Sequence, residues 1–137
     1  MWNAATGKLN FVLKDKERRS AVSSVSFASS NDSKLALTIF NDSVAVWSVD
    51  NGEFMYSLAV AGGGIISLSC SGPWILTGSR DSHVRVWEME TGRLALVLSG
   101  HAESVTHVSI SDNLRVAMSR ANDGWWNSVT KATVSKS

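Results

Sequence analysis

The feature that most constrains the fold of this chain is a tryptophan that recurs at long, regular intervals. Successive copies are separated by 45 and then 40 residues. Each is followed at the fifth position by a glycine, and six residues further on by a leucine. Such a period indicates one supersecondary unit that is copied along the chain. The matched sets are Trp2, Trp47 and Trp87; Gly7, Gly52 and Gly92; and Leu13, Leu58 and Leu98.

Each period carries the pattern of four short strands. β-Branched residues alternate in Val44–Trp47 and Val84–Trp87, which predicts strands with one buried face. The glycine that follows can adopt positive φ in a tight turn, so the tryptophan and the leucine lie on the two arms of a hairpin. Innermost strands are predicted at 22–27, 65–70 and 105–110, and their neighbours at 35–40, 75–79 and 114–119.

The pattern resembles the WD40 repeat family. The resemblance rests on the segments Leu76-Thr-Gly-Ser-Arg-Asp-Ser-His-Val-Arg-Val-Trp87 and Ser99-Gly100-His101. The resemblance implies an all-β fold over residues 1–137: a partial β-propeller with about three antiparallel four-stranded blades. The chain is also similar to the WD repeats of large NACHT/WD-repeat-type scaffolds. The expected divisions are a repeat fragment at 1–13, repeats at about 14–52 and 53–92, and a degenerate repeat at about 93–137.

In WD40 repeats a histidine, a serine or threonine, an aspartate and the tryptophan lock each blade with hydrogen bonds. The repeat ending at Trp87 has Ala61 where the histidine is expected, so we expect unpaired polar groups that cost about 1 to 3 kcal/mol each. Trp126 is expected to fill the tryptophan position of the last repeat. The resemblance assigns structural roles to Trp2, Gly7, Asp42, Trp47, Gly52, Thr77, Ser79, Asp81, Trp87, Gly92, Gly100, His101, Ser119, Asp123 and Trp126.

The function implied by the resemblance is a non-catalytic scaffold that binds a protein or peptide and needs no cofactor. Exposed tryptophans and arginines often anchor protein interfaces. The candidate partner contacts are therefore Arg18, Arg19, Trp74 and Trp125.

Some residues of the chain are also of the types used in hydrolysis or in nucleic-acid binding. Ser119, His101 and Asp123 have the side chains of a hydrolase triad, although the Gly-x-Ser-x-Gly elbow is missing. The segment Lys14–Arg19 carries four basic residues, but two acidic residues interrupt them and no aromatic residue is interleaved, so we expect no nucleic acid partner. The three histidines are too widely spaced for a short metal-binding motif.

Composition sets further limits on the class of protein. The formal net charge of +1 provides no overall field for nucleic acid or anionic lipid, and Cys70 alone cannot form an intrachain disulfide. No apolar run reaches the length of a membrane span. We therefore expect an intracellular, cytoplasmic protein that does not associate with membranes.

About three and a half repeats leave two apolar end faces to be covered, because a blade cannot bury both faces by itself. One hypothesis is that the chain is a segment of a longer propeller whose remaining blades cover these faces. The other is a homodimer, in which two copies cover each other. The sequence leaves both hypotheses open.

Overall fold

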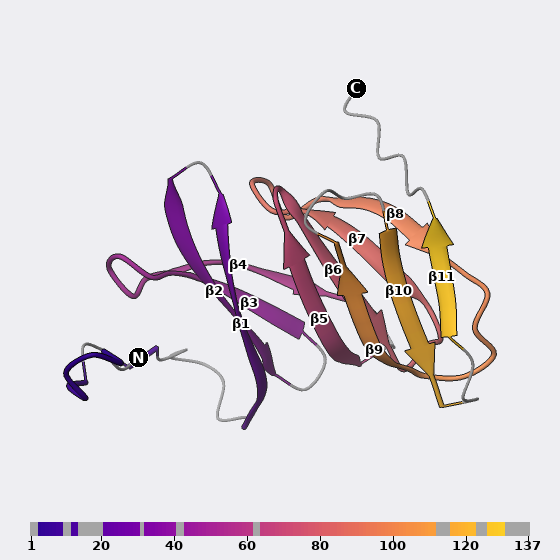
Figure 1. The fold of residues 1–137 in the computed structure, drawn as a ribbon, viewed down its shortest axis with the longest axis horizontal. Coiled ribbons are helices and arrows are strands. Elements are labelled where there is room, and N and C mark those ends of the chain that lie inside the picture. Colours follow the sequence, from indigo (N-terminus) through magenta and orange to yellow (C-terminus); the bar gives the residue numbers. More distant parts are fainter. Residues whose placement is uncertain are drawn as a thin grey trace.

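The structure, a computed structural model, describes residues 3–9, 12–13, 21–30, 32–40, 43–61, 64–111, 116–122 and 126–130. These residues form three antiparallel sheets (Figure 1). The first sheet contains β1 (Val22–Ser30), β2 (Ser33–Phe40), β3 (Ser43–Ser48) and β4 (Phe54–Ala59). The second contains β5 (Ile65–Ser71), β6 (Trp74–Ser79), β7 (Val84–Glu88) and β8 (Leu94–Leu98), and the third contains β9 (Val105–Ile110), β10 (Val116–Ala121) and β11 (Trp126–Thr130).

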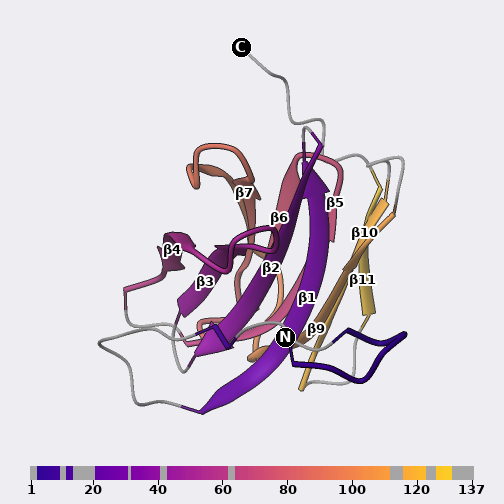
Figure 2. The same cartoon turned by 90° about the vertical axis from the view of Figure 1, so that its left-hand side faces the viewer.

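Strands that are neighbours in a sheet are also consecutive in the chain. The orders are β1-β2-β3-β4, β5-β6-β7-β8 and β11-β10-β9. The second sheet lies between the other two, with β1, β5 and β9 as neighbouring inner strands (Figures 1 and 2). The backbone N–H of Ile110 in β9 donates to Oγ of Ser69 in β5 at 3.3 Å. The predicted all-β architecture of propeller blades, covering part of a propeller, is therefore confirmed.

Two apolar cores hold the sheets together face to face. The core between the first and second sheets buries aliphatic side chains of β2, β3 and β4 against Ile65, Ile75, Trp87 and Met89. The core between the second and third sheets packs β6 and β7 against Val105 and Ala117. Gly78 allows this close approach, because a Cβ atom there would lie 2.7 Å from Cγ1 of Val105. Burial of apolar surface on both faces is what fixes the second sheet between its neighbours.

The hairpin predicted from the Trp-to-Gly spacing recurs three times. Gly7, Gly52 and Gly92 have φ values of 66°, 73° and 68°. Their N–H groups donate to the backbone oxygens of Asn3, Ser48 and Glu88 at 2.8, 3.0 and 2.8 Å. The prediction that each glycine adopts positive φ in a tight turn is confirmed.

The third repeat departs from the predicted register by two residues. β10 spans Val116–Ala121, whereas the sequence pattern predicted 114–119. Val108 lies opposite Ser119, as Leu68 lies opposite Thr77 in the second sheet. Ser119 therefore corresponds to Thr77, and not to Ser79 as the residue types suggested. The connection between β9 and β10 is longer than the short turn at Gly72 and Pro73 between β5 and β6, and this extra length moves the register.

Candidate functional site

Two buried tryptophan–threonine pairs occupy the same position in the first and second sheets. Nε1 of Trp47 donates to Oγ1 of Thr38 at 2.9 Å, and Nε1 of Trp87 donates to Oγ1 of Thr77 at 2.8 Å. Each pair joins the second strand of its sheet to the third. A buried indole N–H is costly without an acceptor, so the threonine at this register stabilises the tryptophan that fills the core.

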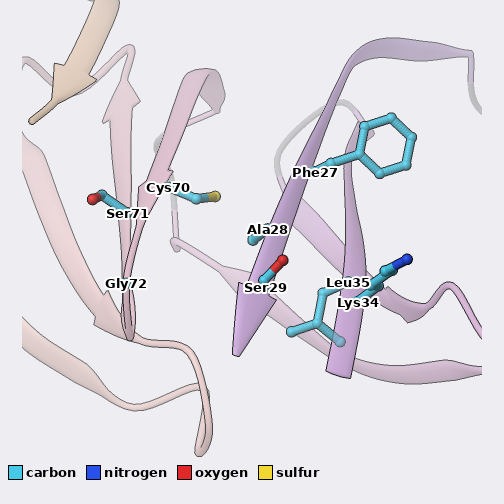
Figure 3. A pocket seen from close by; sticks show the side chains of 8 residues that line it. All are labelled: Phe27, Ala28, Ser29, Lys34, Leu35, Cys70, Ser71 and Gly72. Atoms are coloured by element: carbon cyan, nitrogen blue, oxygen red, sulfur yellow. The ribbon is translucent and has the colours of Figure 1, made fainter. Parts of the chain in front are cut away.

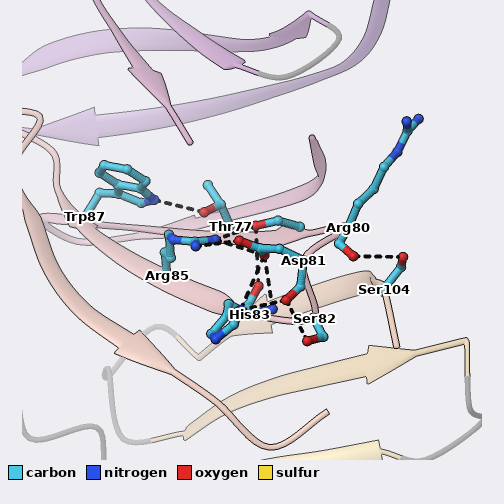
Figure 4. Close-up of polar contacts among 9 residues, drawn as sticks. Thr77, Arg80, Asp81, Ser82, His83, Arg85, Trp87 and Ser104 are labelled. Carbon is cyan, nitrogen blue, oxygen red and sulfur yellow. Dashed lines mark hydrogen bonds and ion pairs between the residues drawn. The ribbon is translucent and has the colours of Figure 1, made fainter. Parts of the chain in front are cut away.

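Arg85 holds Ser79 and Asp81 together in the second sheet (Figure 4). Its Nη1 donates to Oγ of Ser79 at 2.9 Å and to Oδ1 of Asp81 at 3.1 Å, and its Nη2 donates to Oδ2 of Asp81 at 2.6 Å. Ser79 and Asp81 therefore have a charged partner, although the repeat has Ala61 at the position of the histidine. The guanidinium has enough donors to satisfy both residues from a neighbouring strand of the same sheet.

The charge of Arg85 also sets the protonation of Asp81. The hydrogen bonds from Arg85 lower the pKa of the Asp81 carboxyl from 3.8 to about 2, and the backbone N–H of His83 adds to this effect. His83 lies in the turn before β7, where Nδ1 is 2.6 Å from the backbone oxygen of Asp81. The turn between β6 and β7 is consequently held by the charge-assisted hydrogen bonds between Arg85 and Asp81.

His101 and Ser119 form the corresponding polar pair of the third sheet. Nε2 of His101 lies 2.8 Å from Oγ of Ser119. Ser119 is only 5% exposed and shares its register with Thr38 and Thr77. The distance meets the first requirement of a serine–histidine nucleophile, but the hydroxyl belongs to a side chain that is almost fully buried. The geometry is that of a locking contact.

The candidate tryptophans behave differently from the predictions. Trp74 was a candidate partner contact, but it is 7% exposed and packs with Leu76 and Val105 in the core between the second and third sheets. Trp126 was expected to fill the tryptophan position of the last repeat. Instead its backbone pairs with Arg120 at the start of β11, whereas the register of Trp87 is occupied by Val129. The two-residue shift of β10 explains this second error.

Several predicted residues lie outside the described part of the chain. They are Trp2, Arg18, Arg19, Asp42, Asp123 and Trp125, together with the segment Lys14–Arg19. Their proposed roles stay predictions. Gly100, at the start of the connection that carries His101, is described and has a φ of 150°.

A groove opens between the first and second sheets at the ends of two inner hairpins (Figure 3). Its volume is about 590 Å³. The hairpins turn at Asp32 and Gly72, which have φ values of 64° and 53°. Aspartate tolerates this left-handed region better than most residues and glycine adopts it freely. The groove is lined by Phe27, Ala28, Ser29, Lys34, Leu35, Cys70, Ser71 and Gly72.

The groove combines apolar and polar groups. Ala28, Leu35 and Cys70 face the space between the sheets, whereas the Phe27 ring and the Lys34 side chain point away from it on the other side of β1 and β2 (Figure 3). Burial raises the pKa of the Cys70 thiol to about 12, although a hydrogen bond from Ser26 lowers it slightly. A thiol with such a pKa stays protonated at neutral pH and is a weak nucleophile. The groove is thus equipped for binding and not for thiol chemistry.

Among the described residues, no group of three or more histidine, cysteine or acidic side chains is arranged to hold a metal ion. No helix in the described ranges is long and apolar enough to cross a bilayer.

Comparisons with known proteins agree with the repeat pattern. The profile of the family "WD domain, G-beta repeat" matches residues 34–88. A WD repeat-containing protein 26 homolog of Arabidopsis thaliana is 35% identical over 107 residues, which is 72% of this chain and 18% of that protein. The chain therefore spans less than a fifth of the length of this relative.

Solved structures show the same fold. The computationally designed Ika4 protein has a TM-score of 0.76 and 26% identity, covering 94% of this chain and 76% of that one. A chain in the crystal structure titled Mitotic Checkpoint Complex has a TM-score of 0.78 and 20% identity, covering 94% of this chain and 39% of that one. Together with the repeated tryptophan hairpins and the three sheets, these similarities show that the chain belongs to the WD40 repeat family.

Proposed function

We propose that this chain is part of a non-catalytic scaffold that binds another protein, and that the groove between the first and second sheets receives an extended segment of that partner. Membership of the WD40 repeat family supports a scaffold, and one structural relative is a chain in the Mitotic Checkpoint Complex. Because a fold hosts many functions, the argument for the binding site rests on the groove itself.

The groove is the observation that carries the proposal. Its volume of about 590 Å³ is in the range of ligand-binding clefts, and its wall offers apolar and polar surface in about equal parts. Ser29 and Lys34 are exposed at the edge of the first sheet beside the groove. A partner segment that leaves the groove over this edge would meet the Lys34 ammonium there, which favours a carboxylate next to the apolar side chain that enters the groove.

Hydrolysis by Ser119 and His101 receives less support. Ser119 is buried, and neither residue lines the groove. Thr38 and Thr77 occupy the same register position as Ser119 in the first and second sheets, and they accept hydrogen bonds from core tryptophans. The same position thus has a structural contact in all three sheets, and a scaffold explains this repetition better than catalysis does.

Affinity capture with a charge reversal in the groove tests the proposal. Lys34→Glu should lose the partner that wild-type protein retains, since the carboxylate would repel the acidic group of the bound segment. Lys8→Glu is the matched control, because Lys8 is also exposed but lies in the turn at Gly7, away from the groove. Equal recovery of the partner with Lys34→Glu and Lys8→Glu would contradict a role for the groove.

A further inference from the structure

We propose that the turn between β3 and β4 is a site of covalent self-modification, at which Asn51 loses ammonia and becomes aspartate or isoaspartate. Asn51 and Gly52 form the only Asn-Gly pair in the sequence. Glycine has no side chain that would hinder the approach of its backbone nitrogen to the preceding residue. The reaction needs no reactant besides water, and the native turn determines how fast it proceeds.

The reaction joins the Asn51 side chain to the backbone of the next residue. The nitrogen of Gly52 gives its proton to water or hydroxide and attacks Cγ of Asn51. The bond between Cγ and Nδ2 breaks, and Nδ2 takes up a proton and leaves as ammonia, so that a succinimide ring remains. Water then opens the ring. Addition of water at Cγ gives aspartate, whereas addition at the backbone carbonyl carbon gives isoaspartate, in which the main chain runs through the former side chain.

The folded turn holds both reacting groups in other contacts. The N–H of Gly52 donates to the backbone oxygen of Ser48 at 3.0 Å, which opposes loss of the proton from the attacking nitrogen. The Asn51 side chain contacts Glu53 through both of its polar atoms. Oδ1 accepts from the backbone N–H of Glu53 at 3.1 Å, and Nδ2 donates to Oε2 at 2.9 Å. Attack therefore requires the turn to open.

The position of this turn allows it to open without unfolding of the sheet. Asn51 and Glu53 are exposed, so water can replace the hydrogen bonds between them. The turn leads into β4, which is an edge strand of the first sheet. Phe54, the first residue of β4, is 50% exposed and packs edge to face against Trp47. Exposed turns with few buried contacts are the parts of a fold that open at the lowest cost.

The equivalent turns at Gly7 and Gly92 cannot undergo this reaction. Both have the same backbone hydrogen bond and a positive φ, but threonine precedes the glycine in each, and threonine has no amide to lose. The turn at Gly92 is also packed more closely, because a Cβ atom there would lie 3.0 Å from the Tyr56 ring. Thr91 is therefore a matched position at which an Asn-Gly pair can be introduced beside this ring.

Either product adds a negative charge to a turn that already contains two. In the aspartate product an oxygen replaces Nδ2, so the hydrogen bond to Glu53 is lost and two carboxylates face each other, with Asp50 beside them. These like charges repel, and salt screens the repulsion. Isoaspartate also lengthens the backbone between Ser48 and Glu53, where the N–H of Ser48 donates to the oxygen of Glu53 at 2.9 Å. Modification therefore loosens the hairpin of β3 and β4.

Peptide mapping by mass spectrometry, on the full chain incubated at mildly alkaline pH, tests the reaction. Aspartate and isoaspartate should accumulate at Asn51 in the native protein, and on the order of tenfold faster in urea, since the hydrogen bonds of the turn are then open. Asn3, which precedes alanine, is the internal reference and should react more slowly in urea. Thr91→Asn should react as fast as Asn51 in urea but more slowly in the native protein, because Tyr56 covers Gly92.

Thermal unfolding then tests the effect of the product. Asn51→Asp should lower the Tm by a few degrees, and the difference from wild type should shrink at high ionic strength. Asn51→Ser, which adds no charge, is the control and should show no such salt dependence. An unmodified Asn51 in the native protein, equal rates in native protein and urea, or an Asn51→Asp variant as stable as wild type would each overturn the proposal. None of these outcomes depends on the groove, so capture of a partner can succeed or fail independently.

Discussion

Nε1 of Trp87 donates a hydrogen bond to Oγ1 of Thr77 at 2.8 Å, and both residues are buried between the first and second sheets. The Trp87 side chain is therefore bound to the neighbouring strand β6 through the only polar atom of its indole ring. Trp47 and Thr38 repeat the relationship in the first sheet. The period thus marks a packing unit as well as a chain reversal.

Removal of the threonine hydroxyl should weaken this unit. Thr77→Val keeps the shape of the side chain but leaves the buried indole N–H without an acceptor, and we expect a loss of about 1 to 3 kcal/mol in the free energy of unfolding. Urea denaturation followed by circular dichroism measures the change. Thr91→Val, at an exposed turn position, should cost about 0.5 kcal/mol or less. Equal effects of the two substitutions would show that the Trp87 contact contributes nothing specific.

The contact between His101 and Ser119 gives a prediction that separates structure from catalysis. Ser119→Ala should lower the free energy of unfolding by about 1 to 3 kcal/mol, because the contact between Oγ of Ser119 and Nε2 of the part-buried His101 ring is lost. The same variant should match the wild-type protein in a broad screen of ester substrates. Ester turnover that is present in the wild-type protein and absent in Ser119→Ala would contradict the locking role.

Arg85 and Asp81 predict a defined pH dependence. The pKa of Asp81 is lowered from 3.8 to about 2, so its ionised form stabilises the folded state above about pH 4, and this contribution is lost as the pH falls through about 2. Arg85→Lys removes the bidentate contact and should cost about 1 kcal/mol at pH 7, a modest figure because Asp81 is partly exposed. The difference between variant and wild type should shrink between about pH 4 and pH 2.

Acid titration of the unfolding free energy tests this. Arg93→Lys is the control, since Arg93 is exposed and does not contact Asp81. A destabilisation by Arg85→Lys that stays constant down to pH 2 would mean that Arg85 acts through packing and not through the Asp81 carboxylate.

Two glycines in the same turn form a matched pair. Gly7 and Gly92 have φ values of 66° and 68°, so alanine at either position is strained by about 1 kcal/mol. A Cβ atom at Gly92 would also lie 3.0 Å from the Tyr56 ring, whereas at Gly7 it meets nothing within 4 Å. Gly92→Ala should therefore destabilise the protein more than Gly7→Ala in thermal unfolding. A larger effect at Gly7 would contradict the described packing of Tyr56 beneath the turn.

Cys70 should be protected from alkylation in the folded protein. Burial raises the pKa of its thiol to about 12, so the thiolate that reacts with iodoacetamide is scarce at neutral pH. Mass spectrometry should show slow labelling of the native protein and rapid labelling in urea. Native labelling as fast as that of the unfolded chain would show that the thiol is neither buried nor held by the groove.

The first two repeats could be predicted from the sequence because local signals agree with tertiary packing there. The alternating residues of 44–47 and 84–87 set the strand faces, and Gly52 and Gly92 fix the turns. Both signals depend only on chain chemistry over a few residues. The glycine turns and the strands of these repeats are therefore where the sequence pattern and the structure agree.

The third repeat and the candidate site could not be predicted in full, because they depend on tertiary contacts that the spacing of residues in the sequence does not determine. A longer connection between β9 and β10 moved Ser119 to the register of Thr77 and displaced Trp126 from the tryptophan position. Trp74 lies in the core because two sheets close over it, and Arg85, to which the resemblance gives no role, is the residue that holds Asp81. The groove could not be predicted either, since it arises from the way two hairpins diverge in space.

Site-specific photo-cross-linking tests the central claim, that this chain works by holding a segment of another protein in the groove, most directly. A photoreactive amino acid at Ser29, on the groove rim, should yield one dominant cross-linked protein partner, and its yield should fall when Lys34→Glu is combined with it. The same amino acid at Thr91, in an exposed turn of the second sheet, should not capture that partner. Cross-linking of the same partner with equal yield from Thr91, or none from Ser29, would contradict the account.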